Sequence, residues 1–390
     1  IMVNNFYKGE RNQMSYIIAI GAYLVLLMIY GLVIAHKKVK TTDDMMTGGH
    51  KIPFIILVGS LLATWCGGGG ITGSAGVVYT GGPWVGALAY AAPPIGIILL
   101  YFIAGRVRKT NKVTVPEIMG ARYGAATSVI SALCVMLAYV GVLATQLKAA
   151  ADILVLLCHS SGIEVSHGVA LAICTVIIVI ITVGGGLVSV AYSDAISALI
   201  MIGGFFLAIP ILVHVANSQG AVLPPEKASF TGGLSGWTLL GYFLPGLSLM
   251  LGDQNMLQRF ASAKNSDEAK KSNIGMFIGE LLVIISIIAL VTQAAKLYPS
   301  LDTPSNVIFQ VAVDYLPLVF GALVMCACMA FIVTTADSYL LSSATNLTND
   351  IYVKYINKNA TDRQKMNVLR ATIVVFSVIA VALTLYFPTV

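Results

Sequence analysis

Four consecutive glycines, Gly67–Gly70, interrupt an apolar stretch from about residue 53 to residue 79, and they restrict the possible folds more than any other feature. Each glycine costs a helix about 1 kcal/mol relative to alanine. In a membrane, so weak a helix persists only where the interrupted backbone is buried in protein or lines a cavity. Transporters use interrupted helices as binding sites, because free carbonyl groups attract cations and free N–H groups attract anions. Close packing of neighbouring helices is the alternative explanation of the glycines.

The composition identifies the class of protein. Of 390 residues, 57% are hydrophobic and 10% are charged, whereas a soluble domain has about 25% charged residues. Apolar segments of membrane-spanning length recur along the chain, which predicts an all-α polytopic membrane protein and excludes a β-barrel. We expect ten spans, at about residues 14–36, 54–79, 84–105, 124–157, 167–185, 189–215, 235–257, 274–295, 317–345 and 368–388.

The basic residues predict the orientation. Eighteen of the 23 lysines and arginines lie in four alternate loops, after the first, third, seventh and ninth spans. Arg259 is counted in the third of these loops, whereas Lys8, Arg11, Lys227 and Lys296 lie on the opposite side. Because basic loops stay on the cytoplasmic side, we expect a multi-pass protein of the cell membrane with an extracellular N-terminus. The net charge of +6 therefore reflects topology, and no nucleic-acid partner is predicted.

The spans predict two inverted halves. If the first span is peripheral, core helix one is 54–79, and core helix six is 235–257, which is interrupted at residues 252–255 and runs in the opposite direction. Interrupted helices at matching places in two halves indicate an inverted repeat with a central site. We therefore divide the chain into residues 1–53, a first repeat at 54–216, an extracellular loop at 217–234 and a second repeat at 235–390. The sequence ends before a tenth core helix, which is expected to be missing from this chain.

Six ionisable residues fall inside predicted spans, where charge is costly and by default indicates an ion or substrate path. They are Lys148, Asp152, Asp194, Asp253, Glu280 and Asp337. Lys148 and Asp152 have the spacing of an ion pair on one helix, and Asp194 could cap a helix N-terminus. Glu280 could face the cavity without a special role. Thr334, Thr335 and Ser338 place hydroxyl groups near Asp337, and hydroxyl, carbonyl and carboxylate oxygens together suit hard cations.

Four motifs resemble the sodium:solute symporter family in order and spacing. They are Thr334-Thr335-x-x-Ser338 with Asn346-x-x-x-Asp350-Ile351-Tyr352, Gln258-Arg259-x-x-x-Ala263-Lys264, Gly185-Gly186-Leu187 through Asp194, and Thr114-Val115-Pro116-Glu117. The resemblance implies a leucine-transporter-type fold of five plus five inverted helices, here with one extra N-terminal helix. It also implies Na⁺-driven uptake of a small solute by alternating access.

The resemblance also implies cation sites. The family's main sodium site falls on the carbonyl groups of Ala63, Cys66 and Phe331 and the hydroxyl groups of Thr334 and Thr335. In relatives with a second cation, its ligands fall on Asp194, Asp337 and Ser338, with Thr334 as a further candidate. Asp337 stands where a hydroxyl residue is usual, so two carboxylates are expected to meet in that second site.

The same resemblance places the solute beside the interrupted helices. The expected lining residues are Trp65, Gly67, Gly68, Gly69, Gly70, Lys148, Asp253 and Glu280. Trp65 is similar to a cage residue of the choline-transporter branch, although two other cage tryptophans are replaced, near Gly141 and at Leu257. We expect an amine or other cationic group facing Asp253 and Glu280, beside a carboxylate facing Lys148.

Alternative functions remain open at this stage. A proton-coupled or uncoupled carrier of the same fold, or a membrane sensor on a transporter scaffold, would fit the same pattern. An enzyme is not expected, because none of the histidines (His36, His50, His159, His167 and His214) has a cysteine or acid at a useful spacing. The expected partners are Na⁺, a small solute and the lipid bilayer, and the sequence predicts no oligomeric state.

Overall fold

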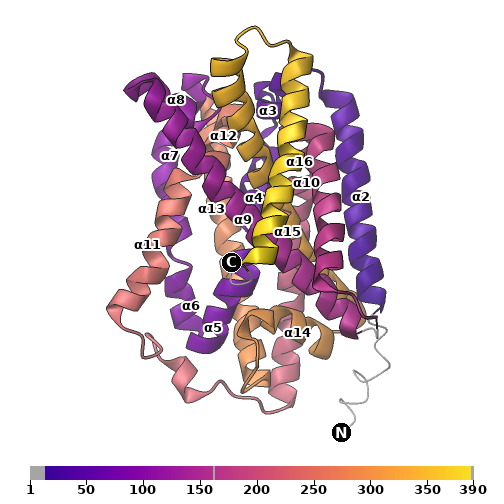
Figure 1. The fold of residues 1–390 in the computed structure, drawn as a ribbon. Coiled ribbons are helices and arrows are strands. Elements are labelled where there is room, and N and C mark those ends of the chain that lie inside the picture. The colour runs from indigo at the N-terminus through magenta and orange to yellow at the C-terminus, as the bar shows by residue number, and fades with distance from the viewer. Residues whose placement is uncertain (1–13, 161–162, 388–390) are drawn as a thin grey trace.

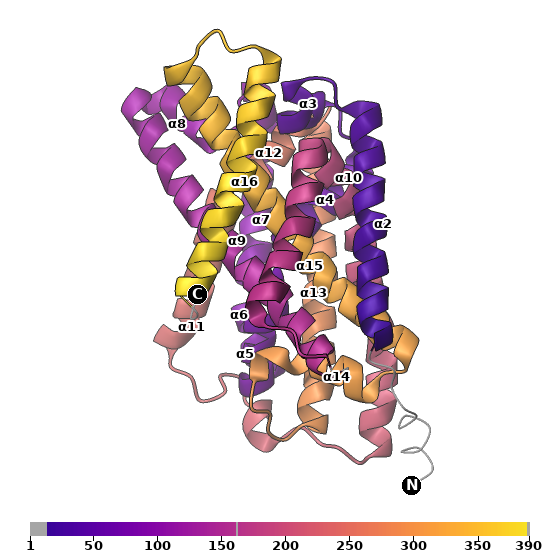
Figure 2. The ribbon, with the colours of Figure 1, turned by 45° about the vertical axis from the view of Figure 1, so that its right-hand side comes forward.

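The computed structural model describes residues 14–160 and 163–387, and these residues form an elongated bundle of helices (Figures 1 and 2). In the first half the helices are α2 (Met14–Lys38), α3 (Thr42–Thr47), α4 (Phe54–Trp65), α5 (Ala75–Gly81), α6 (Pro83–Ala89), α7 (Ala92–Thr110), α8 (Val115–Tyr123), α9 (Ala125–Ser160) and α10 (His167–Ser218). In the second half they are α11 (Gly236–Gly252), α12 (Gln254–Ser262), α13 (Ser266–Leu297), α14 (Val307–Tyr315), α15 (Leu318–Thr345) and α16 (Asp362–Tyr386).

The predicted spans correspond to these helices. Within the described residues, seven helices are long and apolar enough to cross a membrane, and the bent pair Phe54–Trp65 and Gly70–Gly81 makes an eighth. One of the seven, α10, contains two predicted spans, because its helix continues through a kink at Gly186. The remaining predicted span corresponds to α11 and α12, each of which is shorter than the 18 residues required. The described part of the last span ends at Tyr386, and residue 388 lies outside the described residues.

Two helices are interrupted in the same manner. The chain leaves α4 at Cys66, which has extended backbone angles (φ −74°, ψ 92°), and resumes as a helix inclined by 63°. Asp253 has similar angles (φ −69°, ψ 112°) between α11 and α12. In Figure 1 the chain runs downward from α4 to α5 and upward from α11 to α12, so the two interrupted helices run in opposite directions. This arrangement agrees with the predicted inverted repeat.

Helix α15 lies at the centre of the bundle and α2 at its periphery. In the most apolar window of the helix Leu318–Ile356, which contains α15, 72% of the residues are buried, compared with 22% in that of α2. The Phe331 ring of α15 stacks on Phe205 of α10 with ring centroids 5.5 Å apart. Because lipid replaces water around such a bundle, the exposed apolar side of α2 is the expected state of a peripheral span.

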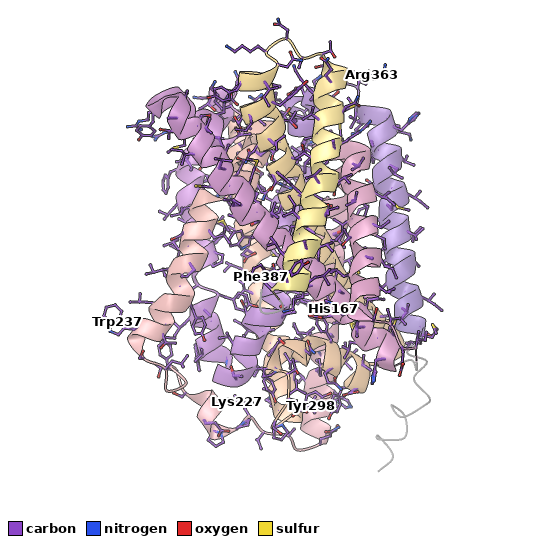
Figure 3. The ribbon with its side chains drawn as sticks, viewed as in Figure 1. His167, Lys227, Trp237, Tyr298, Arg363 and Phe387 are labelled. Atoms are coloured by element: carbon purple, nitrogen blue, oxygen red, sulfur yellow. The ribbon has the colours of Figure 1, made fainter. Side chains whose placement is uncertain are left out.

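The two ends of the bundle contain different loops. Figure 3 shows Arg363 at one end and Lys227 and Tyr298 at the opposite end. We call the first end, which contains α3 and the start of α16, the basic end; it is the end predicted to be cytoplasmic. Lys8 and Arg11 lie outside the described residues. The prediction that Arg259 belongs with the loop charges is wrong, because its side chain is completely buried.

Candidate ion and solute sites

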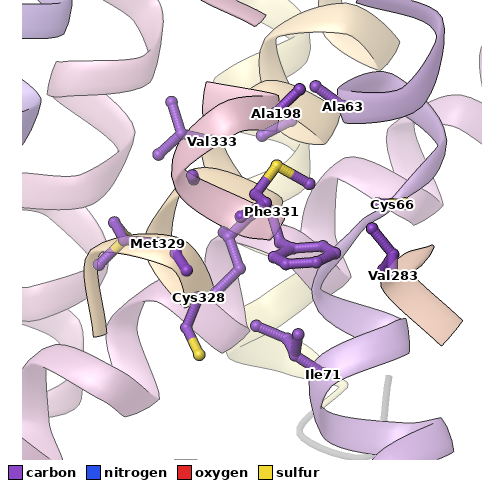
Figure 4. Packing of buried hydrophobic residues seen from close by; sticks show 14 of the residues in the cluster. Ala63, Cys66, Ile71, Ala198, Val283, Cys328, Met329, Phe331 and Val333 are labelled. Atoms are coloured by element: carbon purple, nitrogen blue, oxygen red, sulfur yellow. The ribbon is translucent and has the colours of Figure 1, made fainter. Parts of the chain in front are cut away.

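Five oxygen atoms assigned to the main sodium site lie together in the structure. The Thr334 hydroxyl oxygen lies 2.6 Å from the Ala330 carbonyl of its own helix, 2.9 Å from the Ala63 carbonyl and 3.5 Å from the Phe331 carbonyl. The Thr335 hydroxyl lies 3.2 Å from the Cys66 carbonyl. Figure 4 shows Phe331 beside the helix segment that contains Ala63 and Cys66. Carbonyl and hydroxyl oxygens on two helices are ligands that suit a hard cation such as Na⁺, so the residues present fit this ion.

The interrupted helix exposes its carbonyl groups because Cys66 leaves the helical conformation. An extended residue at this position leaves the carbonyl groups of the last turn of α4 without helical N–H partners. The hydroxyl groups of α15 then provide donors, including the Thr335 hydroxyl, which is 3.1 Å from the Thr64 carbonyl. A bound Na⁺ would accept lone pairs from the same atoms and thus join α4 to α15.

The four glycines divide into two pairs. A Cβ atom on Gly67 would lie 3.0 Å from both Cγ2 and Oγ1 of Thr335, and one on Gly68 would lie 2.9 Å from Oε1 of Gln146. The Gly68 N–H donates to that same oxygen at 2.7 Å. Gly69 and Gly70 face open space, since a Cβ atom added at either would have nothing within 4 Å among the described residues. Close approach therefore explains the first pair, and the cavity explains the second.

This difference gives a matched prediction. We expect Gly67→Ala to weaken Na⁺ binding about tenfold, or about 1.4 kcal/mol, because the new methyl group would displace Thr335. Gly69→Ala adds the same methyl group in open space and should change Na⁺ affinity less than twofold. Na⁺-dependent thermal stabilisation of the purified variants measures both. Equal effects of the two substitutions would contradict the assignment of Thr335 to the ion site.

A cavity of about 390 Å³ lies next to this oxygen cluster. Its lining includes Cys66, Phe331 and Thr335, and the aromatic side chains of Trp65, Tyr90, Tyr242 and Tyr339. The lining residues of α11 all precede the interruption at Asp253. The next helix, α12, is buried almost throughout. The cavity therefore lies on the side of the interruption away from α12.

Glu280 is the single charged side chain among the described residues that line this cavity. It extends from α13 and is only 3% exposed. The Cys66 thiol donates to Oε2 of Glu280 at 3.1 Å, and the Trp65 side chain is a second hydrogen-bond partner of this carboxylate. Trp65, Gly67, Gly69 and Gly70 line the same cavity, as the sequence predicted for solute-binding residues.

Three other residues predicted to bind the solute do not line the cavity. Gly68 is directed toward Gln146, and Lys148 is half-buried elsewhere on α9. Asp253 is 1% exposed and accepts hydrogen bonds from the Tyr139 hydroxyl, from the Tyr339 hydroxyl at 3.0 Å and from the Asn255 N–H at 2.8 Å. Asp253 therefore caps α12, and its interactions with the protein satisfy both of its oxygens.

Two further aspartates, Asp152 and Asp194, were given alternative roles by the sequence: an ion pair with Lys148 and a helix cap. Their partners in the structure bear on these roles. Asp152 is exposed, and its Oδ1 lies 3.1 Å from Nε2 of His167. Asp194 lies inside α10, well past the kink at Gly186. Its Oδ2 accepts hydrogen bonds from Ser60 at 2.7 Å and from Thr64 at 3.3 Å. Because these bonds come from side chains of another helix, capping is not the role of Asp194.

Arg259 is the residue that sequence reasoning missed. Its guanidinium group lies 3.2 Å from Oδ2 of Asp194 and donates to Ser338 at 2.7 Å and to Ser60 at 2.8 Å. These contacts join α4, α10, α12 and α15 next to the ion site. The Gln258-Arg259 motif was the available signal, but its position at a predicted span end resembled a loop charge.

The predicted second cation site therefore contains a cation from the protein itself. Asp194, Asp337 and Ser338 lie in one buried cluster, and Ser338 lies 3.3 Å from Oδ1 of Asp337. Oδ1 of Asp194 has no hydrogen-bond partner among the described residues. The expectation that two carboxylates meet in this site omitted Arg259, whose charge offsets one of them. A second ion in this cluster stays a prediction.

The Asp194–Arg259 pair predicts a large stability effect. Removing one partner of a buried ion pair costs about 3–5 kcal/mol, so Arg259→Gln should strongly lower the thermal unfolding midpoint. Because Asp194→Asn removes the charge left alone, the double variant should recover part of that loss. The Asp362–Lys365 pair is the control, because it is 3.8 Å apart and partly exposed to solvent, and Lys365→Gln should change stability by less than about 1 kcal/mol. Equal effects at the two sites would contradict the buried pair.

Comparison with known proteins now places the chain. A model of the sodium:solute symporter family matches residues 45–389. The chain belongs to the sodium:solute symporter family. The relatives named below are transporters and not enzymes, and membership of this family makes Na⁺ the ion to expect at the oxygen cluster.

Individual relatives differ in what they transport. High-affinity choline transporter 1 of Drosophila melanogaster is 25% identical over 96% of this chain, which spans 62% of that protein. The human high affinity choline transporter 1 is 26% identical over 96% of this chain, which spans 68% of that protein. The sodium/sialic acid symporter NanT of Aliivibrio fischeri is 25% identical over 95% of the chain and 76% of its own length.

The fold also has a close match among solved structures. The structure of a Na⁺-coupled sialic acid symporter in a substrate-bound outward-open state superposes with a TM-score of 0.81, at 18% identity, over 96% of this chain and 82% of that chain. This similarity shows the leucine-transporter-type fold. This chain therefore has the fold that the sequence predicted.

Proposed function

We propose that the protein couples the entry of Na⁺ to the uptake of a small organic cation by alternating access. The observation that carries the proposal is Glu280, a buried carboxylate in a cavity lined by aromatic rings. A carboxylate provides charge, and aromatic faces attract ammonium groups by cation–π interaction. The chain's similarity to choline transporters supports the same chemistry.

In this proposal, Na⁺ stabilises one conformation of the protein. By joining Ala63 and Cys66 to Phe331, Thr334 and Thr335, the ion would hold the interrupted helix against α15. A ligand shifts a conformational equilibrium only through its different affinities for the two states. Na⁺ would therefore favour the conformation in which the cavity opens opposite the basic end. A negative interior adds about 2.3 kcal/mol per charge per 100 mV.

The residues that line the cavity limit the chemical class of the solute. The sequence suggested an amine beside a carboxylate, with Lys148 facing the carboxylate, but Lys148 does not line the cavity. The described lining contains no basic side chain that could hold an anion. We therefore favour an amine or quaternary ammonium compound without a carboxylate. The volume of about 390 Å³ limits the solute to a small molecule.

A ligand screen tests the solute class. Thermal unfolding would be measured with choline, ethanolamine, betaine, proline, sialic acid and glucose, each in Na⁺ and in K⁺. A ligand at one hundred times its Kd stabilises the folded state by about 2.7 kcal/mol. We expect stabilisation by choline or ethanolamine, and more of it in Na⁺ than in K⁺. Stabilisation by glucose or sialic acid alone would refute a cationic solute.

A further inference from the structure

A second cavity, of about 560 Å³, lies at the basic end and shares no lining residue with the solute cavity. It is formed between the end of α2, the segment that contains α3, and the start of the second part of α10. Its lining consists of Lys38, Lys40, Thr41, Asp43, Asp44, Gly48, Gly49, Lys51, Ile52, Pro53, Val188 and Tyr192. Neither the ion site nor the solute site uses these residues.

Three lysines make the cavity basic. Lys38 donates to the Tyr192 hydroxyl, and its ammonium group lies 4.1 Å from the centre of the Tyr192 ring. Lys40 and Lys51 are exposed. Among the described residues, no ion pair within 4.0 Å joins any of the three to a carboxylate. Three ammonium groups therefore surround one hollow, and of these the Lys51 charge also interacts with Asp44.

The two aspartates of the lining are already engaged within α3. Oδ2 of Asp44 accepts hydrogen bonds from the backbone N–H groups of Lys40 and Thr41, each at 2.9 Å, as part of a capping box. Burial alone would raise the pKa of Asp44, but its hydrogen bonds and the charge of Lys51 outweigh burial and lower the pKa. Oδ1 of Asp43 accepts from the Thr47 hydroxyl at 2.7 Å. Both carboxylates stabilise α3, and the lysines outnumber them.

We propose that this cavity binds a phosphate-bearing anion, held by Lys38, Lys40 and Lys51 and by the Tyr192 hydroxyl. Basic pockets between membrane helices on the cytoplasmic side bind the headgroups of acidic phospholipids. The neighbouring surface of α2 exposes Leu32 and Val33, at 39% and 44%, so an acyl chain could lie against it. A soluble phosphate compound has the same recognition chemistry.

Occupancy of this cavity would act on closure of the basic end. The segment that lines it also contacts α12: the Gln258 amide donates to the Met46 carbonyl at 2.6 Å, and His50 Nδ1 lies 2.6 Å from the Ala261 carbonyl. The Ile52 N–H donates to the Ser262 carbonyl at 3.3 Å. An anion that tied this segment to α2 would stabilise the closed end. This consequence rests on the proposed function, whereas anion binding does not.

Direct binding tests the proposal. The probes are dioctanoyl phosphatidic acid, dioctanoyl phosphatidylcholine, whose headgroup has no net charge, and inorganic pyrophosphate. Each is titrated into the detergent-purified protein by calorimetry. We compare wild type with Lys38→Gln/Lys40→Gln/Lys51→Gln. The control is Lys109→Gln/Lys264→Gln/Lys358→Gln, which removes three exposed lysines of the same predicted face outside the cavity.

The expected result is that the cavity variant binds phosphatidic acid or pyrophosphate at least tenfold more weakly, with the control variant unchanged. Binding of phosphatidic acid alone identifies a lipid, and binding of both probes identifies a general phosphate site. Equal unfolding midpoints of the two variants confirm that both are folded. Equal loss in both variants, or no phosphate-dependent binding by the wild type, would overturn the proposal, and neither result would affect the solute site.

Discussion

Thr335→Ala is expected to abolish Na⁺-dependent uptake, because it removes one of the two hydroxyl groups in the main ion site. Thr334 and Thr335 are the only side-chain ligands proposed there, and both are buried. A methyl group cannot replace an oxygen ligand, and the carbonyl of Cys66 would also lose its hydroxyl partner at 3.2 Å. We expect Na⁺ affinity to fall at least 100-fold, or about 2.7 kcal/mol.

Uptake against Na⁺ concentration in proteoliposomes measures this effect. Thr335→Ser is the matched control, because it keeps the hydroxyl group and should retain most of the Na⁺ affinity. Detergent-purified Thr335→Ala should unfold near the wild-type temperature in the absence of Na⁺. Unchanged Na⁺ dependence in a folded Thr335→Ala variant would remove Thr335 from the ion site.

Glu280→Gln is expected to eliminate recognition of a cationic solute while leaving Na⁺ binding in place. Glutamine keeps the shape and can still accept from the Cys66 thiol, so the cavity should remain intact. The loss of charge removes the only carboxylate of the described lining. A hydrogen-bonded partner of a buried charge is worth about 2–5 kcal/mol or more, so solute affinity should fall at least about 30-fold.

Solute-dependent and Na⁺-dependent thermal shifts separate these two effects. Asp267→Asn changes charge identically on the same helix, α13, at an exposed position away from the cavity, and should leave both shifts unchanged. If Glu280→Gln binds the amine with wild-type affinity, another group must compensate the solute's charge, and the proposed solute class loses its basis.

Much of the fold could be predicted because membrane spans have a strong hydropathy signal. The glycine run and the interruption at residues 252–255 also identified the two broken helices, since both are weak points in apolar stretches. The two threonines of α15 were found because hydroxyl groups are conspicuous in an apolar helix. Their proximity to Ala63 and Cys66 came from the family resemblance, because spacing alone does not place one helix against another.

The buried charges were harder to predict. Hydropathy does not distinguish a charged residue in a loop just outside a span from one that is buried among the helices near the end of that span. Arg259 therefore resembles a loop residue in the sequence. Asp253 and Glu280 are both acids in predicted spans, yet tyrosine hydroxyl groups surround Asp253 and a cavity surrounds Glu280. Only the packing of distant helices decides which of two such acids meets a ligand.

Uptake of a radiolabelled quaternary amine such as choline into proteoliposomes tests the central claim most directly. The vesicles would contain K⁺, with either Na⁺ or K⁺ outside. The two arms are compared without valinomycin, and valinomycin is then added to the Na⁺ arm to set a negative interior. The account predicts accumulation above the external concentration only with an inward Na⁺ gradient, and faster uptake with a negative interior. Equal uptake in Na⁺ and K⁺ at matched potential, or no uptake of any amine that stabilises the protein, would contradict it.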